Sequence, residues 1–134
     1  MSTFRFRKKT EYGMMMLARM AREEKGKVVS VKLMQECGLP RSFLVKIARD
    51  LIRANLVMAK EGRGGGYSLV REPSEITLKQ VIEAIEGQVA TVPCLIHKTG
   101  KCPMEDKCSH KATMAEVTEK IGRVLEEYHL SDIC

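Results

Sequence analysis

The sequence contains no tryptophan, and aromatic residues make up only 4% of its 134 residues. Hydrophobic residues still account for 44%, so a core has to be built from aliphatic side chains and methionine. No apolar run approaches the roughly 20 residues that are needed to cross a bilayer. The basic N-terminus, MSTFRFRKKTEYG, lacks the apolar stretch of a secretory signal. These absences predict a cytoplasmic protein, in which five cysteines indicate metal or redox chemistry rather than disulfides.

Enzyme signatures are missing as well. The sequence has no paired acid and base, no nucleophile motif and no cofactor fingerprint outside one cysteine-rich segment, so we do not expect an enzyme.

Positive charge is abundant, and it is unevenly distributed. Residues 1–72 carry 16 Lys and Arg against 7 Asp and Glu, whereas residues 73–134 carry 7 against 10. The first part is therefore a candidate for contact with phosphates, although a solvated basic surface would look the same.

Three helices are expected in the basic part. The first spans TEYGMMMLARMAREEKG, has apolar residues at helical spacing and should end at Gly26. Ser30 can cap a short second helix that stops at Gly38. Cys37, near the end of that helix, is interpreted as a small buried hydrophobic residue. Pro40 then opens the third helix, RSFLVKIARDLIRANL.

The third helix has an apolar side and a cationic side. The residues expected to face the core are Leu44, Ile47, Ala48 and Leu51. The residues on or near the outer side are polar or cationic, namely Arg41, Ser42, Lys46, Arg49 and Arg53. Two helices joined by a tight turn, the second rimmed with cations, form the pattern of a helix-turn-helix. Many helical hairpins share this pattern, so the next segment matters.

The segment LVMAKEGRGGGYSLVR predicts a strand, a glycine-rich turn and a second strand. A hairpin that directly follows the second helix of a helix-turn-helix is a wing. Arg63 lies at its tip beside Gly64 and Gly65, where the backbone can approach a phosphate or a minor groove closely. A nucleotide-binding loop should open a helix, whereas the strand-like YSLV, which includes Tyr67, follows here. We therefore favour the wing.

The acidic part, residues 73–134, begins with a capped helix. Thr77 and Gln80 form a capping box for a helix that extends to about Glu86 and is closed by Gly87. The residues of this helix that should pack inward are Leu78, Val81, Ile82 and Ile85.

A long amphipathic helix is expected from about His110 to Tyr128. Its apolar residues step by threes and fours, like the seam of a coiled coil, at Met114, Val117, Ile121, Val124, Leu125 and Tyr128. A monomer of this size has little else against which to bury such a seam. We interpret it as a dimer interface, in preference to packing onto its own domain.

Between these two helices, residues 88–109 form a loop that holds Cys94, Cys102 and Cys108. Three thiolates on one loop can converge on a soft metal centre. They are separated by seven and by five residues, which is wider than in a typical zinc site and suits an iron–sulfur cluster. The fourth ligand stays open, because His110 follows the last cysteine very closely and His97, between the first two cysteines, is an alternative.

Five segments carry a family resemblance: YGMMMLARMA, SFLVKIARDLIRANLV, GRGGGY, ITLKQVIEAIEG and the three-cysteine loop before a terminal helix. In these segments, and over nearly the whole chain, the sequence resembles the winged-helix transcriptional regulators typified by IscR and NsrR. The fold expected is mainly α with a small β-hairpin: a winged helix-turn-helix domain at 1–72 and a long C-terminal dimerisation helix within 73–134. The resemblance implies a homodimer that binds near-palindromic operators on double-stranded DNA as a repressor or activator.

The resemblance also implies that the three loop cysteines hold a [2Fe-2S] or [4Fe-4S] cluster whose state controls DNA binding. In IscR-like members the fourth ligand is a histidine three residues after the last cysteine, and that position is Lys111 here. In NsrR-like members it is a carboxylate in the first helix of the partner subunit, and Glu11 occupies that position. We therefore favour Glu11 of the partner subunit over His110.

Specific DNA contacts can be expected from the two elements. The recognition helix would enter the major groove and contact it through Arg41, Ser42, Lys46 and Arg49. The wing would contact the minor groove or the backbone through Arg63, Gly64, Gly65 and Tyr67. Two other hypotheses stay open. The cysteines could sense oxidants directly or bind zinc in a regulator without iron. The protein could instead be an iron–sulfur carrier or redox partner whose basic half docks an acidic protein.

Overall fold

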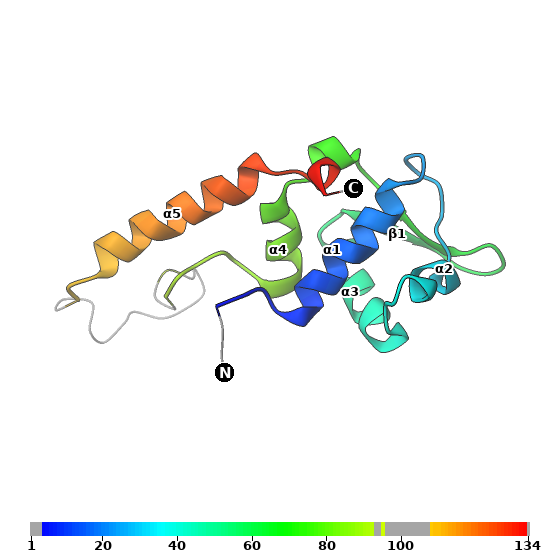
Figure 1. Cartoon of the computed structure of the whole chain (residues 1–134), viewed down its shortest axis with the longest axis horizontal. Coiled ribbons are helices and arrows are strands. Elements are labelled where there is room, and N and C mark those ends of the chain that lie inside the picture. Colours follow the sequence, from blue (N-terminus) through cyan, green and yellow to red (C-terminus); the bar gives the residue numbers. More distant parts are fainter. Residues whose placement is uncertain (1–3, 93–94, 96–107, 134) are drawn as a thin grey trace.

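The structure, a computed structural model, describes residues 4–92, 95 and 108–133. This part of the chain is mainly helical and includes a two-stranded antiparallel sheet (Figure 1). Its elements are α1 (Lys8–Ala21), α2 (Val31–Glu36), α3 (Arg41–Arg53), β1 (Val57–Lys60), β2 (Gly66–Leu69), the 3-10 turn η1 (Pro73–Glu75), α4 (Leu78–Glu86), α5 (Lys111–Glu127) and the 3-10 turn η4 (Leu130–Asp132). The expected fold class is confirmed.

The core is aliphatic and methionine-rich, as the lack of tryptophan predicts. It is built where α1, α3, α4 and the hairpin meet, and its largest fully buried side chains include Met16, Leu17, Met34, Leu44, Ile47, Leu51, Ile76 and Leu130. The predicted inner face of α3 is confirmed, since Leu44, Ile47, Ala48 and Leu51 are all buried. In α4, Val81, Ile82 and Ile85 are buried as predicted, whereas Leu78 is only half-buried. One core therefore fixes α3 against both α1 and α4.

The helix-turn-helix forms with the predicted caps. The Leu33 N–H donates to Ser30 Oγ at 3.2 Å, which begins α2. Gly38 has a φ of +93° and ends the turn after α2, and Pro40 occupies the N-cap of α3. The short connection holds the start of α3 at the surface of the molecule.

The hairpin pairs β1 with β2 in a register that sets Ala59 opposite Tyr67. The sheet is extended by Val29, whose N–H donates to Tyr67 O at 2.8 Å, while the Tyr67 N–H donates to Val29 O at 3.0 Å. Gly66 has a φ of +153°, and a Cβ there would lie 2.1 Å from the backbone oxygen of Val29. Only glycine fits this close approach, so Gly66 fixes the hairpin to the segment before α2.

The chain that follows α5 returns to the segment between η1 and α4. The Leu78 N–H donates to Tyr128 O at 2.9 Å, and the Leu130 N–H donates to Ile76 O at 2.8 Å. Leu130 itself is fully buried. The predicted capping box also forms, because Gln80 N–H donates to Thr77 Oγ1 and Thr77 N–H donates to Gln80 Oε1. Thus α5 is anchored at its C-terminal end.

From its C-terminal end, α5 passes α4 and extends away from α1 and α3 (Figure 1). Its buried residue is Gly122. Of its predicted seam, Val124 and Tyr128 are each 52% exposed, whereas Met114, Val117, Ile121 and Leu125 are half-buried. Within residues 4–92, 95 and 108–133, no helix has the length and the apolar character that crossing a membrane requires.

Two expectations for the basic part are wrong. Helix α1 ends at Ala21 rather than at Gly26. The reason is that REEKGK, which follows Ala21, offers no apolar side chain to pack against the core. Cys37 is exposed rather than buried, because it follows α2 as its C-cap and the buried contact of that helix is made by Met34.

Candidate nucleic-acid interface and cysteine loop

The outer side of α3 is exposed and positively charged. Arg41, Ser42, Lys46 and Arg49 are all exposed, as the helical periodicity predicts. Residues 41–60 contain five Lys and Arg and a single acid, Asp50. That acid forms an ion pair with Lys9 of α1 and has only 18% of its side chain exposed. The face is therefore suited to a polyanion, because its one negative charge is already neutralised.

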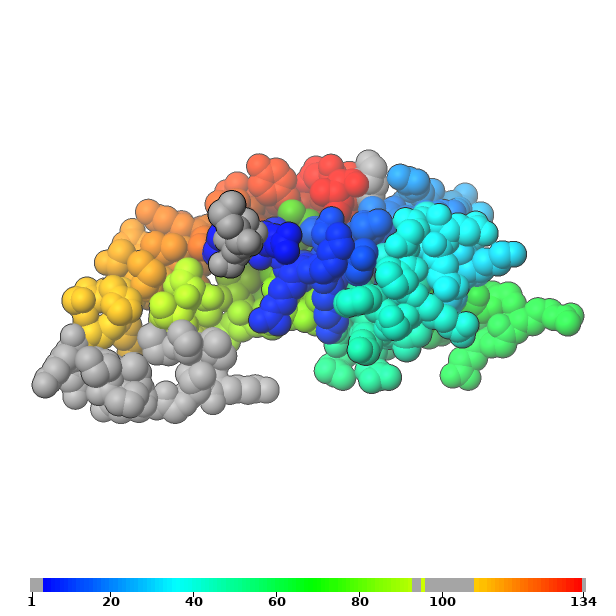
Figure 2. All heavy atoms as spheres, turned by 60° about the horizontal axis from the view of Figure 1, so that its bottom comes forward, coloured from blue at the N-terminus to red at the C-terminus, as the bar shows by residue number. Residues whose placement is uncertain are grey.

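The hairpin packs against α3 through its strands, and its tip projects into solvent. Figure 2 shows the tip in green at one end of the molecule. Arg63 and Gly64 are exposed, and Gly62 and Gly64 have positive φ values. A Cβ on Gly65 would lie 2.3 Å from Lys60 O, so the turn needs glycine there. Strand β2 follows the turn, as expected for a wing rather than a nucleotide-binding loop.

A shallow apolar slot separates α3 from the hairpin. It has a volume of about 240 Å³ and is lined by Val45, Ala48, Arg49, Ile52, Ala59 and Tyr67. The exposed fractions of Val45 and Ile52 are 42% and 38%, which is high for aliphatic side chains. Tyr67, which we predicted to contact DNA, is half-buried in this slot. The slot was not anticipated from the sequence, because it depends on how the hairpin packs beside α3.

The first turn of α1 connects three elements. Glu11, the predicted carboxylate ligand, is exposed, and it accepts a hydrogen bond from Lys8 Nζ at 3.1 Å. Its neighbour Thr10 is fully buried and donates to Glu86 Oε2 of α4 at 2.6 Å. Lys9 pairs with Asp50 of α3. Glu11 therefore stands free of the core on a turn that is fixed to both α3 and α4.

The cysteine loop lies largely outside the described residues. Cys94 and Cys102 belong to the part that is not described. Cys108 is half-buried, and its Sγ lies 3.8 Å from Nδ1 of His110, the alternative ligand. In the described part of the chain, no cluster of three or more His, Cys, Asp or Glu side chains could hold a metal ion. The three-cysteine site stays a prediction.

The start of the loop is fastened to α5. The Thr91 N–H donates to Thr118 Oγ1 at 3.1 Å, and Thr91 Oγ1 donates to Met114 O at 3.2 Å. At the other end, Cys108 is followed almost at once by Lys111, the first residue of α5. Both ends of the cysteine loop are therefore held next to the N-terminal half of α5. Three thiols on a loop held in this way suit an iron–sulfur cluster chemically.

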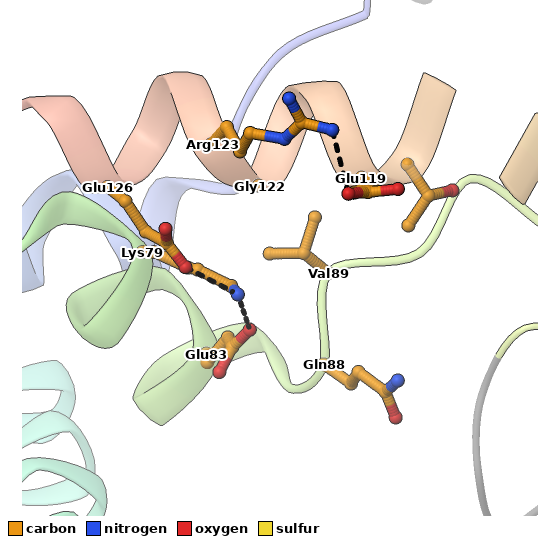
Figure 3. A pocket seen from close by; sticks show the side chains of 9 residues that line it. Lys79, Glu83, Gln88, Val89, Glu119, Gly122, Arg123 and Glu126 are labelled. Atoms are coloured by element: carbon orange, nitrogen blue, oxygen red, sulfur yellow. Dashed lines mark hydrogen bonds and ion pairs between the residues drawn. The ribbon is translucent and has the colours of Figure 1, made fainter. Parts of the chain in front are cut away.

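A polar cleft of about 340 Å³ lies between α4 and α5 (Figure 3). Lys79 Nζ lies 2.9 Å from Glu126 and 3.9 Å from Glu83, and Arg123 pairs with Glu119 at 2.7 Å. The hydrogen bond to Glu126 raises the pKa of Lys79 above its usual value. Because these charges pair with one another, we interpret the cleft as a contact between two helices rather than as a ligand site.

Comparisons with known proteins agree with this arrangement. The family described as "Rrf2: Iron-dependent Transcriptional regulator" matches residues 6–134. The HTH-type transcriptional regulator NsrR of Halalkalibacterium halodurans is 30% identical over 125 residues, which cover 92% of this chain and 86% of that protein.

Two solved structures share the fold. The structure of T. potens IscR has a TM-score of 0.65 and 27% identity, and the match covers 97% of this chain and 85% of that one. The structure of CymR, the global cysteine regulator of B. subtilis, has a TM-score of 0.73 and 23% identity, with coverage of 98% and 96%.

Proposed function

Because the chain belongs to the Rrf2 family of transcriptional regulators, we propose that it is a homodimeric DNA-binding regulator controlled by an iron–sulfur cluster. Family membership sets it among transcriptional regulators rather than enzymes, and it disfavours the carrier hypothesis. The observation that carries the proposal is the exposed cationic face of α3, with a wing beside it, in a chain that also holds a three-cysteine loop.

DNA binding is assigned to α3 and the wing. Arg41 and Ser42 lie in the first turn of α3, and Lys46 and Arg49 follow on its exposed side. An α-helix of this kind fits the major groove, where Arg and Lys recognise guanine and Ser accepts several partners. Arg63 at the wing tip would contact the backbone or the minor groove.

We propose that a second copy of the chain packs against the apolar face of α5. Val117, Ile121, Val124 and Leu125 line an apolar groove of about 290 Å³ on this helix. The groove lies on the helix face that carries the predicted seam, and α4 packs against a different face. A dimer with two-fold symmetry would present two copies of α3 to half-sites about one helical turn of DNA apart.

The proposed cluster ligands are Cys94, Cys102 and Cys108 of one chain and Glu11 of the partner subunit. Glu11 is exposed, so it is accessible to another chain, and its partner within the chain is the exposed side chain of Lys8. The cluster, when bound, would supply a group that responds to iron, oxidants or nitric oxide. A carboxylate binds iron weakly enough to be released when that group changes.

The residues next to Glu11 provide a physical connection to the DNA-binding face. Thr10 is tied to the end of α4, directly before the cysteine loop, and Lys9 is tied to Asp50 of α3. A change in the partner of Glu11 would therefore act on a turn that contacts the recognition helix. Couplings of this type amount to about 1–3 kcal/mol, which corresponds to roughly 5- to 150-fold in affinity.

The test measures operator affinity of protein purified without oxygen, with and without its cluster, together with the visible absorption spectrum. The operator is obtained by selection from random duplex DNA. We expect a coloured protein whose affinity changes at least fivefold when the cluster is removed. Glu11→Ala should reduce this ratio towards one while the dimer persists.

Glu24→Ala is the matched control, because Glu24 is another exposed glutamate just beyond the end of α1. It should behave like the wild type. If Glu11→Ala retains both the cluster and the regulation, the assignment of Glu11 as a ligand is wrong.

A thiol switch or zinc site without iron is the second candidate. It is favoured by one observation, that the described residues include two free cysteines, of which Cys37 is exposed. This candidate predicts a colourless protein after anaerobic reconstitution. It also predicts that oxidants and reductants, rather than iron and sulfide, change the affinity for DNA.

A further inference from the structure

We propose that Val45 determines part of the operator sequence by contacting the methyl group of a thymine in the major groove, from the apolar slot between α3 and the hairpin. This inference rests on the proposed function, because it assigns a base to the same DNA-reading surface. It concerns which DNA bases the protein recognises, and not the signal that controls DNA binding.

The position of Val45 on α3 places it in the middle of the DNA-reading face. Ser42 precedes it by three residues and Arg49 follows by four, so the three side chains lie along one side of the helix. All three are exposed, and Val45 has 42% of its surface accessible. A helix that inserts Ser42 and Arg49 into the groove must also bring Val45 to the base edges.

The slot gives Val45 apolar neighbours on the side of the hairpin. Ala48 and Ile52 continue its stripe along α3, and the cross-strand pair Ala59 and Tyr67 closes the other wall. A methyl group that entered this space would leave water for an aliphatic surface, which is favourable. Arg49 at the rim of the slot can still reach a neighbouring base or phosphate.

The charges around the slot favour DNA as its occupant over another protein. Arg49 lines the slot, Lys46 is exposed on α3 and Lys60 ends β1, and the single acid among residues 41–60 is already paired with Lys9. A polyanion is attracted to this surface, and a duplex is the polyanion that also offers isolated methyl groups.

The chemistry of base edges then selects thymine. Guanine, cytosine and adenine present hydrogen-bond donors and acceptors in the major groove, and thymine adds the C5-methyl group. A valine side chain can neither donate nor accept a hydrogen bond. An apolar contact is the interaction left to it, and the thymine methyl is the natural partner.

The experiment replaces each thymine of a selected operator, one at a time, by deoxyuridine. This change removes the methyl group and keeps the base pair and the O4 acceptor. Affinities are measured for the wild-type full-length chain, for Val45→Ala and for Met58→Ala. Met58 is the matched control, because it is an apolar side chain of similar exposure, 55%, that does not line the slot.

For the wild type, deoxyuridine at one thymine of each half-site should weaken binding by about fourfold per methyl removed. Val45→Ala should weaken binding to the thymine operator by a similar factor and should no longer distinguish thymine from deoxyuridine at that position. Met58→Ala should keep the wild-type preference. Neither variant should change the melting temperature of the free protein, because both side chains are exposed.

Several outcomes would overturn the inference while leaving the proposed function intact. Wild-type affinity could be the same for thymine and deoxyuridine at every position. The deoxyuridine penalty could persist in Val45→Ala, or Val45→Ala could bind as tightly as the wild type, as a slot that receives another protein would predict. If instead the wild-type chain selects no duplex sequence at all, the proposed function fails, and the inference fails with it.

Discussion

Helices α3 and α5 are both amphipathic, but within the described chain the apolar side of α3 is fully buried, whereas that of α5 is half-buried or exposed. Leu44, Ile47 and Leu51 of α3 are fully buried against α1 and α4. In α5, which is longer, the buried residue is Gly122, and Val124 stays 52% exposed. An amphipathic pattern thus predicts a helix in both places but leaves open whether its partner is in the same chain.

The difference separates two sources of stability. The winged-helix part holds its recognition helix through a core of its own, so DNA contacts can be formed on a rigid support. Helix α5, which we call the α5 arm, is fixed at its C-terminal end by two hydrogen bonds, from Leu78 N–H to Tyr128 O and from Leu130 N–H to Ile76 O. Its apolar seam is half-buried or exposed in the described chain, so under our proposal a second copy of the chain would add to the stability of this region.

The largest effect is expected where the winged-helix part is packed most tightly, at Gly66. Gly66→Ala would place a Cβ 2.1 Å from Val29 O, a backbone atom that cannot move independently, at a φ of +153°. Overlap and backbone strain together should lower the free energy of unfolding by about 3 kcal/mol or more. Urea denaturation followed by circular dichroism measures the change.

Gly64→Ala is its control, because it has a φ of +75° but nothing within 4 Å of the added Cβ. It should lower the free energy of unfolding by about 1–2 kcal/mol, from strain alone. Equal losses at the two glycines would show that the close approach to Val29 is not what holds the hairpin.

The next effect tests the α5 arm. Val124→Asp introduces a charge in the apolar groove that we assign to the second copy of the chain. It should weaken the dimer by about 2–3 kcal/mol, or roughly 30- to 150-fold in dissociation constant, while the winged-helix part stays folded. Analytical ultracentrifugation measures the dimer, and circular dichroism measures the fold.

Ala115→Asp on the same helix is the matched change at an exposed position outside the seam. It should leave the dimer unaltered. A Val124→Asp variant that sediments like the wild type would mean that α5 is covered in some other way.

A smaller effect is expected at the junction between α1 and α4. Thr10 is fully buried, and its hydroxyl donates to Glu86 at 2.6 Å. Thr10→Val keeps the shape and removes the donor, so the free energy of unfolding should fall by about 1–2 kcal/mol. Arg7→Ala removes the other contact of Glu86, an ion pair at 3.7 Å whose arginine side chain is 80% exposed. Its effect should stay below about 0.5 kcal/mol, as for most exposed pairs.

Local signals predict most of the fold. The capping box at Thr77, the proline before α3 and the glycine-rich hairpin set element ends correctly because each acts over a few residues. The predicted end of α1 is wrong because the polar segment after Ala21 contains helix-forming residues and has no stop signal of its own before Gly26. The pairing of Val29 with Tyr67 and the return of Leu130 to Ile76 could not be predicted, since they join residues that are far apart in the sequence.

The candidate site divides in the same way. Helical phase predicts that Arg41 and Arg49 are exposed, and the structure confirms it. The slot at Val45 could not be predicted because two elements form it together. Nothing in the sequence near Val45 indicates where Tyr67 lies. The burial of Thr10 has no sequence signal either, because its partner is Glu86.

A small effect of opposite sign is expected at Gly122, the buried residue of α5. A Cβ there would lie 3.6 Å from Lys79 Cε, an ordinary contact, so Gly122→Ala should raise the free energy of unfolding by about 0.5–1 kcal/mol through helix propensity. In α1, by contrast, a Cβ on Gly13 would lie 2.2 Å from Ile85 Cδ1 within the core, so Gly13→Ala should be destabilising by about 1 kcal/mol. Denaturation compares the two variants, and sedimentation follows the dimer of Gly122→Ala. A loss of stability or of dimer at Gly122 would mean that something approaches this helix more closely than Lys79 does, and the cover of α5 would then have to include the face towards α4.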